Sequence, residues 1–171
     1  WFQSARQAVR DGFVDDQGLA VASLGWEARA ALNQGFLRQA VLLYQQQLAA
    51  GDRSAVNSLR IIARKVHGED LPEIRKLAQH PETRNLVNHY LASNDSLSSH
   101  VPNKDKQVLL RWTQLLEQQG IRDQASAEIL ALAAYRTGEA DLARRWIKLG
   151  NPGSITLRWI QAKLLLQDGE H

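Results

Sequence analysis

The sequence predicts an all-α fold made of antiparallel helix pairs joined by tight turns, and three observations support this prediction. The dominant residues, Ala, Leu, Gln and Arg, have high helix propensity. Prolines number only four, and the alternating Val/Ile/Thr runs of strands are missing. Glycines and polar turns separate apolar-periodic stretches of about 10 to 17 residues. Helices are therefore expected at residues 1–10, 17–34, 37–50, 53–66, 71–79, 81–92, 104–119, 123–137, 139–149 and 154–168.

Several helix starts follow from local side-chain chemistry. Asp70 and Glu73, with a proline between them, form a capping box in which Asp70 accepts from first-turn amides and Glu73 reaches back. Asp15 is expected at a helix start, where the helix dipole favours negative charge. Ser154 follows a Pro–Gly break and is expected to cap the last helix. The polar segment 93–103 resists a helical interpretation and is expected to be a long loop or a partly ordered insertion.

A spacing of glycine, small residue and large apolar residue occurs twice. Gly35 is followed by Ala40 five residues on and by Tyr44 four residues further. The segment 138–147 has glycine, alanine and isoleucine at the same intervals. Glycine permits a tight turn, the small residue lets two helices approach closely, and the large residue fills the groove to the next pair. The spacing therefore predicts repeated helix hairpins.

At these positions the chain resembles the tetratricopeptide repeat family. Counting back from Gly138, four residues match the family's large, large, small and apolar positions on its first helix: Ala127, Leu130, Ala131 and Ala134. The resemblance covers residues 1–66 and 123–171, whereas the consensus is weak in the middle segment 67–122. We expect a single helical-repeat domain over residues 1–171 that is a segment of a longer array, since the chain holds no methionine, not even at position 1.

The first copy resembles the Sel-one-like branch of the family. Tyr44 is followed by Gly51, Ala55 and Leu59 at the spacing of that branch's linker and next helix. Glu27 stands at a position that is usually apolar and so departs from the pattern. Repeats of this branch, with the Arg and Gln richness, suggest a bacterial protein of the cell envelope or the cytosol.

The resemblance implies a right-handed α–α superhelix of stacked hairpins with a concave groove. It implies a scaffold that binds a protein or peptide partner, with no catalytic residue and no cofactor. Carried over to this sequence, the family's groove positions are Arg29, Leu32, Asn33, Glu128, Leu132, Tyr135 and Arg136.

The sequence contains little that indicates chemistry. The lack of cysteine excludes disulfides and thiolate ligands, and the usual nucleotide and hydrolase motifs are missing. One serine-rich segment superficially contains an acid, a nucleophile and a base, namely Asp95, Ser98 and His100. Such a trio in a serine-rich loop is interpreted as chance. No metal site is expected, because no two histidines have the three- or four-residue spacing of a helical pair. The histidines are His67, His80, His89, His100 and His171.

Charge and aromatic residues leave two alternatives to a scaffold. Lys plus Arg number 21 against 18 Asp plus Glu, a net of +3 scattered along the chain, which disfavours an RNA-binding helical repeat. The other alternative is a non-catalytic helical arm of a larger enzyme, such as a bacterial cell-wall lytic enzyme.

No apolar run approaches the roughly 18 residues of a membrane span. Four tryptophans are expected to pack between hairpins, in core or semi-exposed positions: Trp26, Trp112, Trp146 and Trp159.

Overall fold

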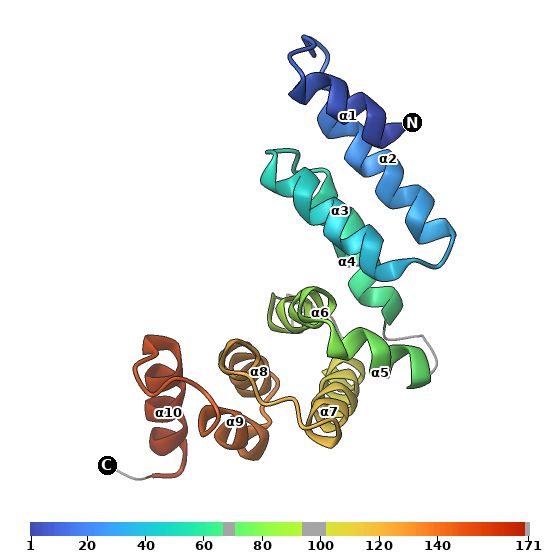
Figure 1. Cartoon of the computed structure of the whole chain (residues 1–171). Coiled ribbons are helices and arrows are strands. Elements are labelled where there is room, and N and C mark those ends of the chain that lie inside the picture. The colour runs from blue at the N-terminus through green and yellow to red at the C-terminus, as the bar shows by residue number, and fades with distance from the viewer. Residues whose placement is uncertain (67–70, 94–101, 170–171) are drawn as a thin grey trace. The chain divides into compact units, whose positions relative to one another are not determined.

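The computed structural model describes residues 1–66, 71–93 and 102–169, which form ten α-helices and contain no strand. The helices are α1 (Phe2–Arg10), α2 (Leu19–Asn33), α3 (Leu37–Ala49), α4 (Ala55–Val66), α5 (Leu71–Gln79), α6 (Pro81–Ser93), α7 (Pro102–Gln118), α8 (Gln124–Arg136), α9 (Ala140–Ile147) and α10 (Ile155–Gln167) (Figure 1). The all-α prediction is confirmed for these residues. Each expected helix has a counterpart whose ends differ from the expected ones by no more than two residues.

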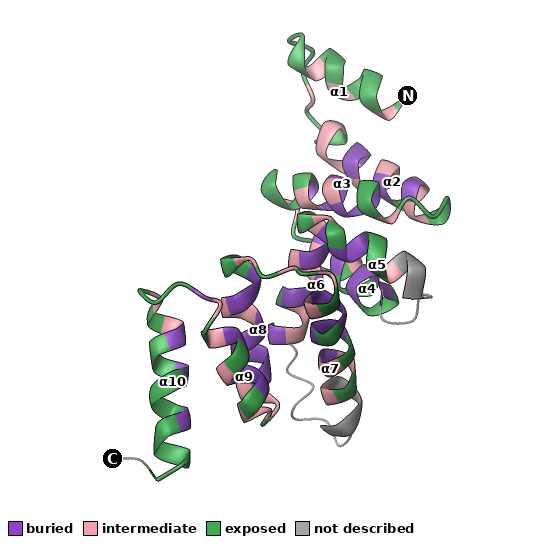
Figure 2. Ribbon diagram, turned by 60° about the horizontal axis from the view of Figure 1, so that its bottom comes forward, coloured by how far each residue is buried: buried purple, intermediate pink, exposed green. Residues whose placement is uncertain are grey.

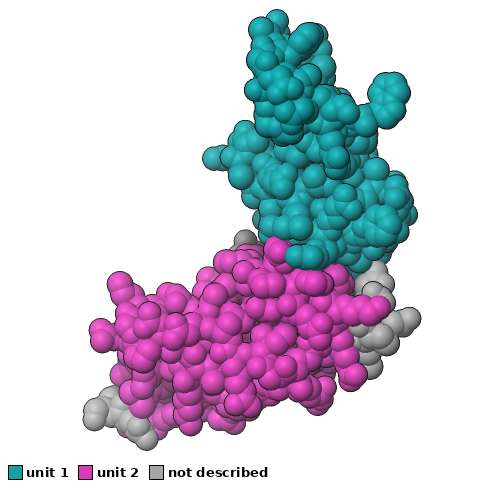
Figure 3. All heavy atoms as spheres, in the orientation of Figure 1, with its two compact units in different colours: residues 1–69 teal, residues 70–171 magenta. Residues whose placement is uncertain are grey.

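The chain divides into two compact units, residues 1–69 and 70–171 (Figure 3). Helices α1 to α4 belong to unit 1, and α5 to α10 belong to unit 2. Each unit has its own buried residues (Figure 2).

Unit 1 is a run of helices in which each packs on the next in the sequence: α1 on α2, α2 on α3, and α3 on α4. Gly35 makes the turn between α2 and α3 with a φ of +82°, a backbone conformation that residues with a Cβ rarely adopt. Ala28 on α2 and Ala40 on α3 are both 0% exposed, so the two backbones approach closely. Tyr44 follows on α3 and is also buried.

Glu27 lies on the inner side of α2 although it is charged, because an arginine of α1 pairs with it. The Arg6 guanidinium forms an ion pair with the Glu27 carboxylate and donates a hydrogen bond of 3.0 Å to Ser23 Oγ. The Arg6 and Glu27 side chains are only 14% and 13% exposed. A buried ion pair thus takes the place of an apolar contact between α1 and α2.

Unit 2 is organised around α8, which packs against α6, α7, α9 and α10. Further packing joins α5 to α6 and α9 to α10 (Figure 1). The four positions counted back from Gly138 are all 0% exposed: Ala127, Leu130, Ala131 and Ala134. Ala143 and Trp146 on the facing helix α9 are also 0% exposed. The hairpin of α8 and α9 is therefore a close contact of small residues beside a large indole.

A chain of buried polar side chains joins α6, α7 and α8. Trp112 Nε1 on α7 donates to Asn88 Oδ1 on α6 at 2.8 Å, and Asn88 Nδ2 donates to Ser126 Oγ on α8 at 3.0 Å. Ser126 Oγ in turn donates to Asp123 Oδ2 at 2.9 Å. The Arg84 guanidinium lies 3.2 Å from the same carboxylate oxygen. Each member has a partner at hydrogen-bond distance, which makes the burial of these polar groups tolerable.

Predicted helix caps are present where the structure describes them. Ser154 Oγ accepts from the Leu157 amide at 3.3 Å, and the Asp15 carboxylate accepts from the Leu19 and Ala20 amides at 2.7 Å each. The capping box at Asp70 lies outside the described residues, as do residues 94–101 of the expected loop 93–103. The ends of that expected loop are helical instead: Ser93 is the last residue of α6, and residues 102 and 103 begin α7, where a first-turn proline sacrifices no intrahelical hydrogen bond.

Candidate functional site

The most developed exposed surface of unit 2 lies where α8 and α10 pack together. The rings of Tyr135 on α8 and Trp159 on α10 meet edge to face, with centroids 5.4 Å apart and an interplanar angle of 78°. Trp159 remains 47% exposed, and Lys163 Nζ lies 5.9 Å from the Trp159 ring centroid. We call the following residues the α8–α10 surface: Glu128, Leu132, Tyr135, Trp159 and Lys163.

Helical spacing groups these side chains within each helix, and the contact between Tyr135 and Trp159 joins the two groups. Glu128, Leu132 and Tyr135 follow one another at four and three residues, so they share one face of α8. All three are half-buried. Trp159 and Lys163 are four residues apart on α10, and both are exposed. The surface therefore combines an aromatic and aliphatic centre with one acidic and one basic side chain at its edge.

Arg136, the remaining predicted residue of this unit, has a different environment. Its guanidinium Nη1 donates to the carbonyl oxygen of Ala92, near the carboxyl end of α6. A cation is favourable there, since the unpaired carbonyls of a helix end carry partial negative charge. The contact fixes the end of α8 against α6, so Arg136 supports the α8–α10 surface from beside it.

The predicted residues of unit 1 lie on α2. Arg29 and Asn33 are exposed, and Leu32 is half-buried. Trp26 precedes Arg29 by three residues on the same face and is 52% exposed, with its ring 6.3 Å from that of Phe2 on α1. Unit 1 therefore presents an exposed tryptophan next to a cation. Its ring contact with Phe2 is longer and tilted at 47°, whereas Tyr135 and Trp159 meet edge to face at 5.4 Å.

The four tryptophans divide between the two expected environments, core packing and semi-exposed packing. Trp112 and Trp146 are 4% and 0% exposed and pack in the core of unit 2, whereas Trp26 and Trp159 are about half exposed. The sequence contains a spacing that indicates a shared position for Trp159 on α10 and Glu128 on α8. Trp159 and Lys163 stand ten and six residues before Gly169, as Glu128 and Leu132 stand before Gly138.

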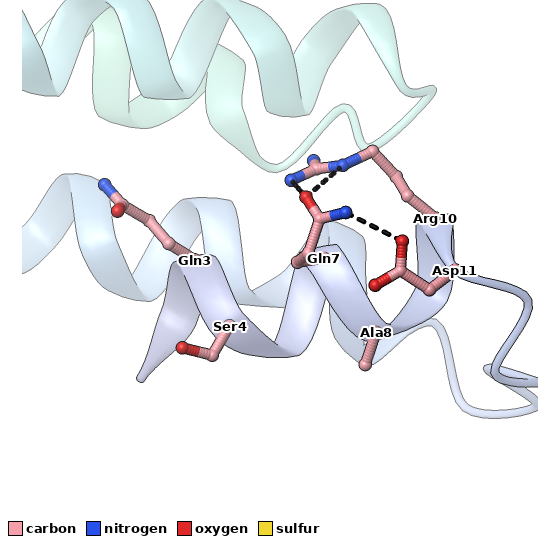
Figure 4. A pocket seen from close by; sticks show the side chains of 6 residues that line it. All are labelled: Gln3, Ser4, Gln7, Ala8, Arg10 and Asp11. Carbon is pink, nitrogen blue, oxygen red and sulfur yellow. Dashed lines mark hydrogen bonds between the residues drawn. The ribbon is translucent and has the colours of Figure 1, made fainter.

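A shallow depression runs along α1 (Figure 4). All of its lining side chains are exposed and come from one helix or its C-cap: Gln3, Ser4, Gln7, Ala8, Arg10 and Asp11. Gln7 accepts from Arg10 at 3.1 Å and donates to Asp11 at 2.8 Å, so the polar groups pair with one another. The depression does not enclose a ligand and is not assigned as a site.

The pKa shifts in the chain have structural causes. Hydrogen bonds from the Ser54 side chain and then from Gln47 hold the pKa of Asp52 below its ordinary value. The Asp168 carboxylate raises the pKa of Arg144 by accepting a hydrogen bond from it, which ties α9 to the end of α10. Neither group belongs to the α8–α10 surface.

The part of the chain that the structure describes contains no group of three or more histidine, aspartate or glutamate residues able to hold a metal ion. None of its helices has the length and apolar character needed to cross a bilayer. The Asp95, Ser98 and His100 trio lies outside the described residues. Comparison of the chain with protein-family models, curated proteins and solved structures finds no match.

Proposed function

We propose that the chain is a non-catalytic protein-interaction module of helical-repeat type, and that unit 2 binds a protein or peptide partner on the α8–α10 surface. The observation that supports this proposal most strongly is the exposure of Trp159, 47%, beside a second aromatic ring and a cation. Tryptophan, tyrosine and arginine are the residues that most often dominate the binding energy of protein interfaces.

The geometry of this surface favours binding because its aromatic side chains are held before a partner arrives. Tyr135 is half-buried on α8, and its edge-to-face contact restricts the rotation of the Trp159 ring. A pre-oriented ring loses less conformational entropy on binding than a free one. Glu128 and Lys163 at the edge offer charged groups for hydrogen bonds to the partner.

The order of packing in unit 2 supports a helical repeat. Helices α6, α8 and α10 pack one against the next, and α9 contacts both α8 and α10. Repeat arrays have this near-neighbour pattern, in which alternate helices line one side. The full burial of Ala127, Leu130 and Ala131 agrees with the spacing that resembles the tetratricopeptide repeat. In this proposal Tyr135 and Trp159 lie on the concave side of a right-handed superhelix of Sel-one-like type.

The test is to select peptides from a phage-displayed library on the full chain and to measure the affinity of a selected peptide by fluorescence anisotropy. We expect Trp159→Ala to weaken binding by at least about tenfold, since a central aromatic residue contributes more than the surrounding contacts. Tyr135→Ala should weaken binding in the same direction, because Trp159 loses its support.

Trp26→Ala is the matched control, since Trp26 is 52% exposed but lies in unit 1. It should change the affinity by less than about twofold, within the range of a residue outside the interface. Far-UV circular dichroism checks that all variants remain helical. Equal affinities of wild type and Trp159→Ala, or an equal loss in Trp26→Ala, would contradict the proposed surface.

A further inference from the structure

Gly25 stands in the middle of α2, where a glycine needs a structural reason. Within a helix, glycine is unfavourable relative to alanine because its backbone loses more conformational freedom on folding. Gly25 makes no turn, and it is not among the described glycines with positive φ. A Cβ at this position would lie 2.8 Å from Oε1 and 2.9 Å from Nε2 of Gln47 on α3. Gly25 therefore leaves the space in which the Gln47 amide lies against α2.

The same amide reaches the turn that leads into α4. Gln47 is only 5% exposed, and its Nε2 donates to Asp52 Oδ2 at 2.7 Å and to Ser54 Oγ at 3.3 Å. Asp52 Oδ1 in turn accepts from the Ser54 backbone amide at 2.9 Å. Helix α4 begins at Ala55, directly after this turn. One buried side chain of α3 thus touches α2 and the start of α4.

The Asp52 carboxylate sets the orientation of the Gln47 amide. An ionised carboxylate only accepts hydrogen bonds, so the amide must turn its Nε2 toward Asp52. Oε1 then lies closest to the Cβ position of Gly25, buried and without a hydrogen-bond partner among the described residues. Because the amide is the flexible end of the side chain, it is the group that yields to an atom added at position 25. Such a movement would take Nε2 away from Asp52.

We propose that Gln47 is a latch that holds the turn before α4 against α2, and that Gly25 is the notch that seats this latch. The latch lies within unit 1 and does not depend on the proposed binding surface of unit 2. It couples the two segments through one amide, so a substitution on α2 changes the hydrogen bonds of Asp52.

Stability alone does not test the latch, because Gly25→Ala has two opposing effects. Alanine has a higher helix propensity than glycine, which favours the variant. Displacement of the Gln47 amide costs a hydrogen bond, which disfavours it. The measurement must therefore follow the latch itself.

The experiment is an NMR titration of the Asp52 carboxyl group in the full chain and its variants. In the wild type the pKa of Asp52 is lowered by the Ser54 side chain and next by Gln47. Gly25→Ala and Gln47→Ala should both raise the titration midpoint toward the ordinary 3.8, because each removes the hydrogen bond from the Gln47 amide. Gly25→Ala should also shift the side-chain amide signals of Gln47.

Hydrogen exchange of the turn gives a second measurement that does not depend on titration. The amides of Ala55 and Val56 donate to the carbonyl oxygens of Asp52 and Arg53 at 3.4 and 3.1 Å. If the latch holds this turn, both amides should exchange at least about threefold faster in Gln47→Ala than in the wild type.

The Gln47→Ala background is the matched control for the notch. There the added Cβ meets no amide, so Gly25→Ala should leave the Asp52 midpoint unchanged and should stabilise the chain through helix propensity alone. Should Gly25→Ala fail to fold by itself, folding of the double variant would support the notch, and failure of both would overturn it.

Three further results would overturn the latch. They are an Asp52 midpoint that Gly25→Ala does not raise, an equal rise of this midpoint on Gly25→Ala in the Gln47→Ala background, and unchanged exchange of the Ala55 and Val56 amides in Gln47→Ala.

Discussion

At the scale of single residues, Asn88 links three helices of unit 2 through one buried amide. It is 0% exposed, accepts from the indole of Trp112 on α7, and donates to Ser126 on α8. Bulk water cannot replace Asn88 as the hydrogen-bond partner of either residue, since Trp112 is 4% and Ser126 0% exposed. The amide therefore fixes the relative positions of these helices through hydrogen bonds.

Asn88→Ala should lower the free energy of unfolding by about 2–3 kcal/mol, because it leaves the buried indole N–H of Trp112 without an acceptor and removes the hydrogen bond that Ser126 Oγ accepts. Urea denaturation measures this change. In the Asn88→Ala background Trp112→Phe should cost less than in the wild type, by at least about 0.5 kcal/mol, because the indole has already lost its acceptor. Additive effects of the two substitutions would show that the hydrogen bond contributes nothing.

Asp52 gives a prediction about pH. Its pKa is lowered from the ordinary 3.8, mainly by the hydrogen bond with the Ser54 side chain and next by the one with Gln47. A group with a lowered folded-state pKa stabilises the protein above its unfolded pKa, and this contribution is lost as the pH falls through the folded value. Carbon-detected NMR titration should therefore give Asp52 a midpoint below 3.8, and Ser54→Ala should raise it. A midpoint at or above 3.8 in the wild type would refute this account.

Individual residues also show where sequence reasoning ends. Ala127 and Ala131 were matched to packing positions of the first helix through the resemblance to the tetratricopeptide repeat, and they are fully buried. The placement of Glu27 was not predictable from spacing, because its charge is neutralised by Arg6, 21 residues earlier in the chain. The connection from Asn88 to Ser126 spans 38 residues in the segment where the repeat consensus is weak.

At the scale of the elements, the turn from α9 to α10 depends on close approach at Gly150. A Cβ placed there would lie 2.2 Å from Cδ1 of Leu157, a core residue of α10 that is 3% exposed. Gly150 therefore allows α10 to fold back against the end of α9. Its role is steric, since Gly150 is not among the described glycines with positive φ.

Gly150→Ala should lower the free energy of unfolding by about 1–3 kcal/mol, the usual cost of overpacking a core contact. Gly153→Ala in the same turn is the matched control. Its nearest neighbour, Asn151 Oδ1, is 3.3 Å from the added Cβ and exposed, so the change should stay within about 0.5 kcal/mol. Thermal or urea unfolding checks both variants. Equal stability of the two variants would contradict the proposed contact with Leu157.

The elements were the most predictable level of this structure, because glycines and polar turns separate them along the sequence. Ten helices were expected and ten are described, including those in segment 67–122, where no repeat consensus could be recognised. What the sequence could not supply was the partner of each helix face. The apolar face of α10 at Ile155 and Leu166 is as hydrophobic as its buried face, so hydropathy alone did not separate an exposed face from a core face.

At the scale of the whole molecule, the chain has two compact units, and one of them presents the α8–α10 surface. Three of the five residues of this surface were named as groove positions from the sequence, namely Glu128, Leu132 and Tyr135 on α8. Trp159 and Lys163 were not, because Trp159 was assigned to core or semi-exposed packing and the groove positions were carried over only to α2 and α8. The arrangement of α8 and α10 reveals that Trp159 packs edge to face with Tyr135 and remains 47% exposed.

The measurement that tests the central claim most directly is chemical-shift mapping of the ¹⁵N-labelled chain with a library-selected peptide. The account predicts that the largest changes occur at the indole of Trp159 and at backbone amides of α8 and α10, while the indoles of Trp26 and Trp112 keep their positions. Largest changes within residues 1–66, or at the buried indole of Trp112, would contradict binding on the α8–α10 surface.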